Sequence, residues 1–251
     1  MFQLDRFANP SRFAQLAHRI APLCLWLSLG GFIWGLYLGL IASPADYQQG
    51  DSVRIMYVHV PSAWLALSSY LSLGLCALFF IVWRHQLADI AARAILPVGA
   101  GFALITLVTG SLWGKPIWGT YWVWDARLTS MLVLFMFFIG YGALRYSFEN
   151  AEKGARMASI LALIGCVNLP IVKFSVDWWN TLHQPASILR SGGMAIDSSM
   201  LWPLFVMFGA FQLFFIWIVL HRMLWMMAAR RQHRQTAAYR PLTTATLSDA
   251  E

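Results

Sequence analysis

Six apolar segments, each close to the length needed to cross a lipid bilayer, constrain the fold of this chain most strongly. A transmembrane helix needs roughly 20 predominantly apolar residues. The 251 residues are 59% hydrophobic and only 12% charged, far below the charge content of soluble domains. We predict an all-α integral membrane protein, a single membrane domain over residues 1–251 built as a six-transmembrane-helix bundle, with spans at about 20–41, 62–82, 94–112, 128–146, 157–174 and 200–220.

Details of three spans refine this prediction. The first is longer than the roughly 7–15 apolar residues of a signal peptide, so we expect a retained anchor. Its Gly31, Gly35 and Gly39 recur every four residues and predict close contact with another helix, in the same bundle or in a partner subunit. Pro61 is expected in the first turn of the second span. The polar end of the fifth span predicts a break or a wet cavity there.

The basic residues predict how the bundle lies in the membrane. With six spans, both termini and loops 2–3 and 4–5 share one side, which holds 13 of the 18 Lys and Arg residues. The positive-inside rule makes that side cytoplasmic. We therefore expect a bacterial inner (plasma) membrane protein with both termini in the cytoplasm and an irregular cytoplasmic tail at 223–251. The net charge of +7 then reflects topology and contact with the lipid membrane, and nucleic-acid binding is not indicated.

A tryptophan-rich segment, residues 113–125, connects the third and fourth spans on the predicted outer side. It holds four tryptophans and one tyrosine among thirteen residues, interrupted by two glycines and a proline. One or two rings at a bilayer boundary are ordinary membrane anchors. Five rings exceed that need and indicate a platform for a large flat ligand, because aromatic faces stack favourably.

Two of the six histidines lie on the outer side, and both are next to tryptophans. His59 precedes Trp64, and His183 follows Trp178 and Trp179. The other four lie at the cytoplasmic boundary among arginines. Two neutral imidazoles that bracket an aromatic surface match the axial ligands of a six-coordinate haem iron. We predict that His59 and His183 are these metal ligands.

Residues 118–125 fit the pattern W-G-x-x-W-x-W-D, which resembles the haem-handling membrane proteins of cytochrome c maturation, specifically the haem exporter protein C family. The resemblance covers most of the chain and implies that the two outer histidines are axial ligands of a non-covalent, transient haem b. It implies delivery of haem to a periplasmic haem chaperone during c-type cytochrome biogenesis. It also implies three further partners: an ATP-binding cassette (ABC-type) ATPase, a membrane permease subunit and a small single-span membrane protein.

Other residues complete the predicted haem site. Haem propionates require counter-charges on the same face, and Arg54 and Arg127 are the candidates chosen from four of the five outer cations, Arg54, Lys115, Arg127 and Arg190. Asp125 is expected to cap the fourth span, to serve the site, or both. The predicted cofactor-binding set is therefore His59, His183, Trp113, Trp118, Gly119, Trp122, Trp124, Asp125, Arg54 and Arg127.

Catalytic machinery is not indicated by the sequence. Residues 110–115 resemble a phosphate-binding loop but are one residue short and are followed by Pro116. The three cysteines lie in predicted spans without a C-x-x-C pattern. We expect a non-catalytic subunit, with any ATP hydrolysis performed by a partner. The alternatives are a b-type cytochrome electron-transfer subunit, which would place its histidines deep in the spans, and a structural scaffold, for which the outer aromatic residues would be needless.

Overall fold

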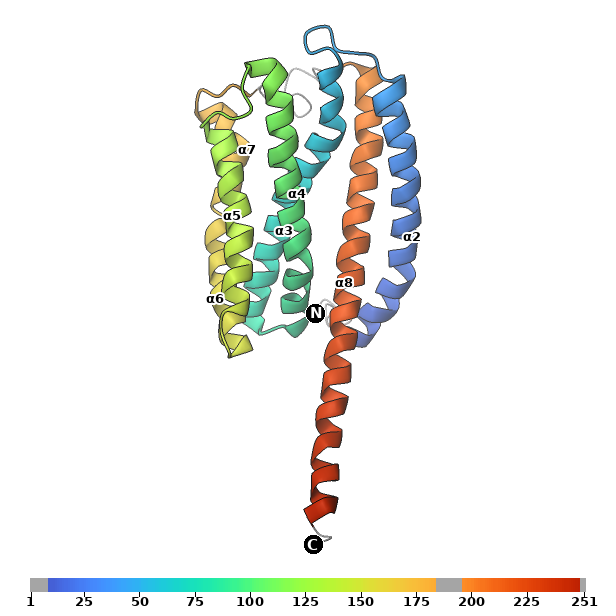
Figure 1. The fold of residues 1–251 in the computed structure, drawn as a ribbon, viewed down its shortest axis with the longest axis vertical. Coiled ribbons are helices and arrows are strands. Elements are labelled where there is room, and N and C mark those ends of the chain that lie inside the picture. Colours follow the sequence, from blue (N-terminus) through green and yellow to red (C-terminus); the bar gives the residue numbers. More distant parts are fainter. Residues whose placement is uncertain (1–8, 184–195, 249–251) are drawn as a thin grey trace, which may run out of the picture.

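The computed structural model describes residues 9–183 and 196–248, and these residues form a bundle of long helices (Figure 1). Short polar caps begin several of them; for example, the Asn9 side chain accepts from the Ser11 backbone N–H. The elements in chain order are α2 (Pro10–Tyr37), the π-helical turn η1 (Leu38–Ala42), the 3₁₀ helix η2 (Asp51–Ile55), α3 (Met56–Trp83), α4 (Gln86–Trp118), α5 (Ala126–Tyr146), α6 (Ala151–Gly165), α7 (Asn168–Trp178) and α8 (Ser198–Ser248).

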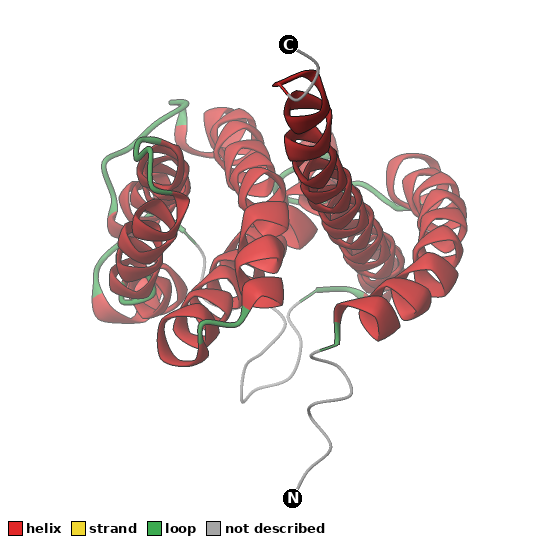
Figure 2. Ribbon diagram, turned by 90° about the horizontal axis from the view of Figure 1, so that it is seen from below, coloured by secondary structure: helices red, strands yellow, loops and turns green. Residues whose placement is uncertain are grey.

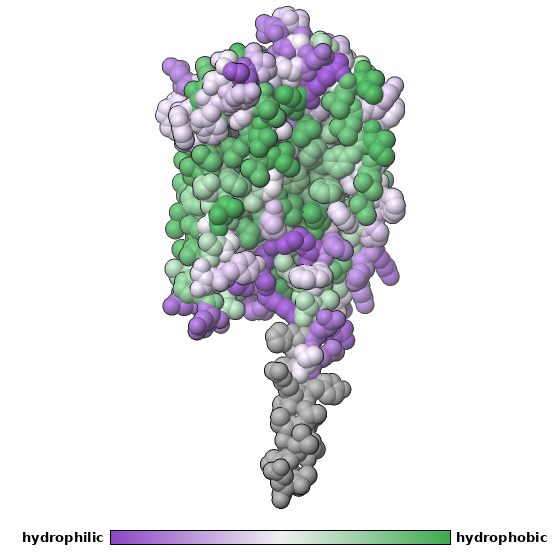
Figure 3. Space-filling view, in the orientation of Figure 1, coloured by the Kyte–Doolittle hydropathy of each residue, from purple (hydrophilic) through white to green (hydrophobic). Residues whose placement is uncertain are grey.

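Six of the described helical segments are long and apolar enough to cross a membrane, with α6 and α7 together forming one of them. On the face shown in Figure 3, apolar side chains form a broad band across the middle of the molecule, and hydrophilic residues gather toward its two ends. Helix α2 begins, and α8 ends, at the same end of the bundle (Figure 1). The predicted all-α, six-span membrane fold is confirmed.

The bundle is assembled from three groups of neighbouring helices: α2 with α8, α3 with α4, and α5 with α6 and α7 (Figures 1 and 2). Of the three regularly spaced glycines of the first span, Gly31 and Gly35 lie where α2 meets α8, whereas Gly39 lies in η1 against the ring of Tyr57 in α3. A Cβ built on Gly31 would stand 2.9 Å from the Cβ of Ala210, and one on Gly35 would stand 2.5 Å from Sδ of Met207. These glycines therefore serve packing inside the bundle.

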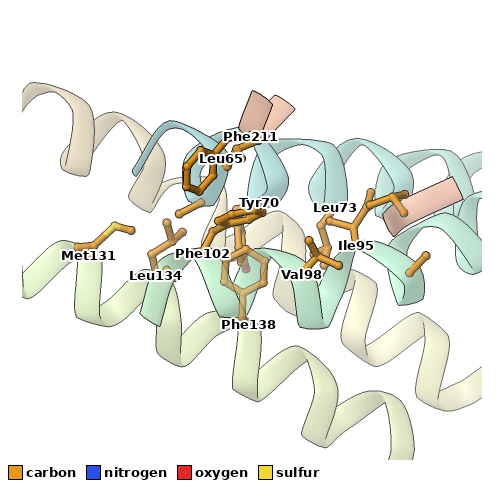
Figure 4. Packing of buried hydrophobic residues seen from close by; sticks show 14 of the residues in the cluster. Leu65, Tyr70, Leu73, Ile95, Val98, Phe102, Met131, Leu134, Phe138 and Phe211 are labelled. Atoms are coloured by element: carbon orange, nitrogen blue, oxygen red, sulfur yellow. The ribbon is translucent and has the colours of Figure 1, made fainter. Parts of the chain in front are cut away.

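A single apolar core joins α3, α4, α5 and α8 (Figure 4). Tyr70 and Phe138 meet edge to face with ring centroids 4.9 Å apart. At the end of the bundle where α8 continues outward, the buried carboxylate of Asp89 accepts from Arg145 at 3.1 Å and from Arg230 at 3.0 Å. This ion-paired cluster ties α4, α5 and α8 together at that end.

Several boundaries differ from the sequence-based expectations. Helix α3 begins at Met56, so Pro61 lies inside the helix and leaves the Tyr57 carbonyl without its helical donor. The expected irregular tail is wrong for most of its length, because α8 continues without interruption to Ser248. The fifth span agrees with its expectation instead: of the break and the wet cavity proposed for it, the break is present, with α6 ending at Gly165 and α7 starting at Asn168.

The tryptophan-rich segment is only partly a loop. Its first six residues, 113–118, are the last turns of α4, which ends at Gly119 in the left-handed conformation (φ +76°). Glycine adopts this conformation without steric cost, so it is a frequent helix terminator. The connection to α5 then runs over residues 119–125, at the end of the bundle opposite the long extension of α8 (Figure 1).

Candidate functional site

His59 lies in the first turns of α3 and faces α4. Its Nδ1 lies 3.0 Å from Oγ1 of Thr109, and its ring meets Trp113 edge to face with centroids 5.6 Å apart. A Cβ built on Gly110 would stand 3.0 Å from Cε1 of His59. Gly110 therefore lets the imidazole lie directly against the backbone of α4.

His183 lies in the connection that follows α7, and it turns toward the start of α5. Its Nδ1 is 3.0 Å from Oδ2 of Asp125, whose side chain is only 6% exposed. The imidazole also meets Trp118 edge to face, with centroids 4.8 Å apart. Burial lowers the pKa of His183 below its ordinary value, while the hydrogen bond and the charge of Asp125 act in the opposite direction.

The two histidines are neighbours in space although 124 positions separate their numbers. Their side chains interact electrostatically, and the positive charge of Arg127 acts on both imidazoles. Within residues 9–183 and 196–248, no group of three or more His, Cys, Asp or Glu side chains could hold a metal ion. A pair of imidazoles is a ligand set that suits a metal whose remaining coordination positions are filled by a macrocycle.

Helix α4 carries the rings nearest to the histidines. The Trp113 indole N–H donates to Oε1 of Gln49 at 2.9 Å, which fixes that ring to the loop between η1 and η2. Trp118 folds back over Gly114, where a built Cβ would stand 2.7 Å from Cε3 of the indole. Trp113 and Trp118 thus each contact one of the two histidines, and Gly119 ends the helix directly beyond them.

The remaining tryptophans of the segment lie farther along the connection. Trp122 and Trp124 meet edge to face, with centroids 5.5 Å apart. Trp124 is 75% exposed, whereas the buried indole N–H of Trp122 has no hydrogen-bond partner in the described part of the chain. The segment therefore divides into two rings that contact the histidines and a ring pair that reaches the surface.

Asp125 forms hydrogen bonds both to the start of α5 and to His183 in the connection that follows α7. Oδ1 accepts from the Leu128 backbone N–H at 2.8 Å and caps α5, while Oδ2 faces His183. The expected cap is confirmed, and the same side chain also contacts His183. Because the cap fixes the carboxylate, the acceptor behind His183 is held in place by the start of α5.

The two candidate arginines lie in different surroundings. Arg127, in the first turn of α5, reaches α7, where its Nε lies 3.3 Å from Oγ of Ser175. Arg54 instead pairs with Asp51 at 3.1 Å and donates to the backbone carbonyls of Leu40 and Ser43. Arg54 therefore binds the end of the first span, and of the two it is Arg127 whose charge acts on the histidines. Another outer cation, Arg190, lies outside the described residues.

Sequence reasoning missed three residues that support the site: Thr109, Gln49 and Ser175. Each is a single polar residue in a helix or loop, with no local pattern that marks it. Their roles depend on which helices become neighbours, and the spacing within one segment does not contain that information. Only Thr109 carries a usable signal, as a hydroxyl inside an apolar span four residues before Trp113.

Comparison with known proteins identifies the relatives of this chain. The family model described as heme exporter protein C matches residues 3–238. The heme exporter protein C of Bradyrhizobium diazoefficiens is 52% identical over 83% of this chain and 79% of its own length. That of Escherichia coli K12 is 45% identical over 80% of this chain and 81% of its own length.

A plant protein is also similar. The putative cytochrome c biosynthesis ccmC-like mitochondrial protein of Marchantia polymorpha is 49% identical over 72% of this chain and 78% of its own length. The family match, the high identities over most of each chain and the six-span fold agree with one another. This chain therefore belongs to the heme exporter protein C family.

Proposed function

We propose that this protein binds haem b non-covalently at the periplasmic face of the inner membrane and presents it to a periplasmic haem chaperone during c-type cytochrome biogenesis. His59 and His183 would hold the iron as axial ligands. The observation that carries the proposal is that these two histidines, from α3 and from the connection after α7, interact electrostatically and each have a tryptophan beside them.

The surrounding residues fit a haem. Two imidazoles satisfy the axial positions of the iron, and indole rings offer faces and edges to a large aromatic ligand. Arg127 is half-buried and acts electrostatically on both histidines, so it is the cation best placed for a propionate. A bidentate arginine–carboxylate pair would fix the orientation of the bound group as well as add affinity.

Delivery rather than permanent retention is supported by two features. Bacterial relatives are named heme exporter protein C, and the plant relative is named for cytochrome c biosynthesis. The exposed Trp124 and its partner Trp122 lie beyond the inner pair of rings, where an acceptor can reach them. In this proposal the protein is a non-catalytic subunit, and an ABC-type ATPase, a permease subunit and a small single-span protein act with it.

Absorption spectra of the purified protein test the proposal. We expect a six-coordinate, low-spin haem spectrum, lost in His59→Ala and in His183→Ala, with most haem absent when both are replaced. His221→Ala is the matched control, because His221 stacks on Trp217 in α8, away from both outer histidines. An unchanged spectrum in the double variant would show that His59 and His183 are not the iron ligands. Failure of a coexpressed chaperone to acquire haem would instead favour an electron-transfer subunit.

A further inference from the structure

The hydroxyl of Thr109 has backbone acceptors of its own, so its oxygen is free to accept from His59. Its single proton is directed to the backbone carbonyl of Ile105, with Oγ1 and that oxygen 2.6 Å apart. The same Oγ1 lies 3.0 Å from Nδ1 of His59. Because a hydroxyl carries one proton, a Thr109 hydroxyl that donates to Ile105 receives the hydrogen of this second contact from the imidazole.

A second acceptor on α4 agrees with this assignment. The backbone carbonyl of Thr106, which cannot donate, lies 3.4 Å from the Thr109 hydroxyl oxygen and also interacts with the His59 imidazole. His59 is therefore held with its proton on Nδ1. In a neutral imidazole this leaves a free lone pair on Nε2.

His183 reaches the same protonation pattern through a different partner. An ionised carboxylate only accepts, so the 3.0 Å contact between Asp125 Oδ2 and Nδ1 requires a proton on Nδ1 of His183. The other carboxylate oxygen is occupied by the Leu128 N–H at 2.8 Å, which prevents the carboxylate from turning away. The side chain of His183 is 20% exposed, so this bond is largely shielded from water.

We propose that Thr109 and Asp125 are positioning residues that lock both outer imidazoles in the Nδ1–H tautomer, so that two Nε2 lone pairs are available to one iron. This inference rests on the proposed haem-binding function and adds to it the groups that orient the ligands. Partners of this kind typically fix the ring and raise its basicity as a ligand.

The two partners are unequal, and this makes the ligands unequal. Asp125 carries a full negative charge, whereas Thr109 is a neutral hydroxyl already polarised by its own bond to Ile105. A charge-assisted hydrogen bond transfers more electron density to the imidazole than a neutral one. His183 is therefore the stronger electron donor, and it favours the oxidised form of a bound iron more than His59 does.

The tautomers can be measured without haem. In ¹⁵N-histidine-labelled protein, nitrogen chemical shifts distinguish Nδ1–H from Nε2–H, and the His59→Ala and His183→Ala variants assign the signals. We expect both outer histidines to be Nδ1–H in the unaltered protein. Thr109→Val should release His59 into a mixture of tautomers, and Asp125→Asn should do so for His183. An Nε2–H signal from either histidine in the unaltered protein would overturn the proposal.

Haem titration and redox potentiometry supply the second readout. We expect Thr109→Val and Asp125→Asn each to weaken haem binding by about 10- to 100-fold. Asp125→Asn should raise the midpoint potential of the bound haem more than Thr109→Val does, since it removes a charge. The matched control is Ser72→Ala, which deletes a hydroxyl bonded to the backbone carbonyl of Ser68 within α3, outside the contacts of both outer histidines.

The positioning role of Thr109 and Asp125 and the proposed haem-binding function can fail separately. If the histidine variants alter the haem spectrum but Thr109→Val and Asp125→Asn keep tautomers, affinity and potential unchanged, the positioning role is wrong and the ligands stand. If the histidine variants leave the haem spectrum unchanged, the proposed function itself is wrong.

Discussion

Gly31 of α2 and Ala210 of α8 lie in such close contact that a methyl group on the glycine would stand 2.9 Å from the Cβ of the alanine and 3.4 Å from its Cα. Neither of these two atoms can move without shifting the α8 backbone. The preceding residue, Gly30, has no atom within 4 Å of an added Cβ. Two adjacent glycines on one helix therefore have opposite surroundings.

The surroundings of Gly30 and Gly31 predict opposite effects of the same substitution. Gly31→Ala should destabilise the bundle by about 1–3 kcal/mol, the usual cost of overpacking a close contact. Gly30→Ala should be neutral or stabilise by up to about 1 kcal/mol, because alanine is the better helix former. Thermal unfolding of both variants in detergent, followed by circular dichroism, measures the difference. Equal melting temperatures would show that α2 and α8 do not meet at this contact.

The two candidate arginines also predict different outcomes. Arg127→Gln should weaken haem binding by about 10-fold, as expected for loss of one charge-assisted hydrogen bond to a propionate. Arg54→Gln should leave haem affinity within about 2-fold of the original, because its guanidinium is engaged by Asp51 and by backbone carbonyls. Haem titration of the two variants, read against their melting temperatures, separates binding from stability. A larger loss of affinity in the Arg54 variant would assign the propionate to the first outer loop.

Much of the fold could be predicted from the sequence, because in a lipid environment the pattern of hydrophobicity along the chain is almost sufficient to locate the spanning helices. Spanning helices must satisfy their own backbone hydrogen bonds, so each apolar run specifies one helix. The ends were harder to place. Pro61 suggested the start of a helix, yet the 3₁₀ turn before Met56 leads the chain into α3 earlier. The polar tail suggested irregular chain, yet α8 continues through it.

The candidate site was only partly predictable for a different reason. His59, His183 and the tryptophans could be singled out because each belongs to an unusual local cluster. Their hydrogen-bond partners could not, since the contacts join residues 50 positions apart for Thr109 and 58 apart for Asp125. The different surroundings of Arg54 and Arg127 could likewise not be predicted, because in the sequence both are arginines on the predicted outer side. Their partners depend on the tertiary structure.

The orientation of the bundle in the membrane is open to a direct test. From the distribution of basic residues, we predict that the tryptophan-rich connection is periplasmic and that the loop between α5 and α6 is cytoplasmic. In a background without the three native cysteines, Thr120→Cys should react with an impermeant thiol reagent added to intact spheroplasts. Glu149→Cys should react only after lysis; both positions are exposed. The reverse pattern would invert the protein and place the candidate site in the cytoplasm.

The last prediction concerns how haem binding and haem transfer are divided among the tryptophans. Trp118 contacts His183, whereas Trp124 is exposed at the surface. Trp118→Ala should therefore weaken haem binding and lower haem occupancy. The expected loss of binding free energy is roughly 1–3 kcal/mol, if an indole contributes as it does in stacking on nucleic-acid bases. Trp124→Ala should retain more haem but disturb docking of the acceptor. Trp→Phe at either position should be milder, because a ring face remains.

Transfer to the periplasmic chaperone distinguishes these roles. Haem staining of the chaperone after coexpression should show little transfer from a Trp118, Trp122 and Trp124 triple alanine variant, even when added haem restores loading of the membrane protein. Trp26→Ala is the control, because Trp26 is 70% exposed on α2, outside the tryptophan-rich segment. Undiminished transfer from the triple variant would mean that the histidines alone hold and present the haem. In that case the rings would be membrane anchors, the ordinary role of tryptophan at a bilayer boundary.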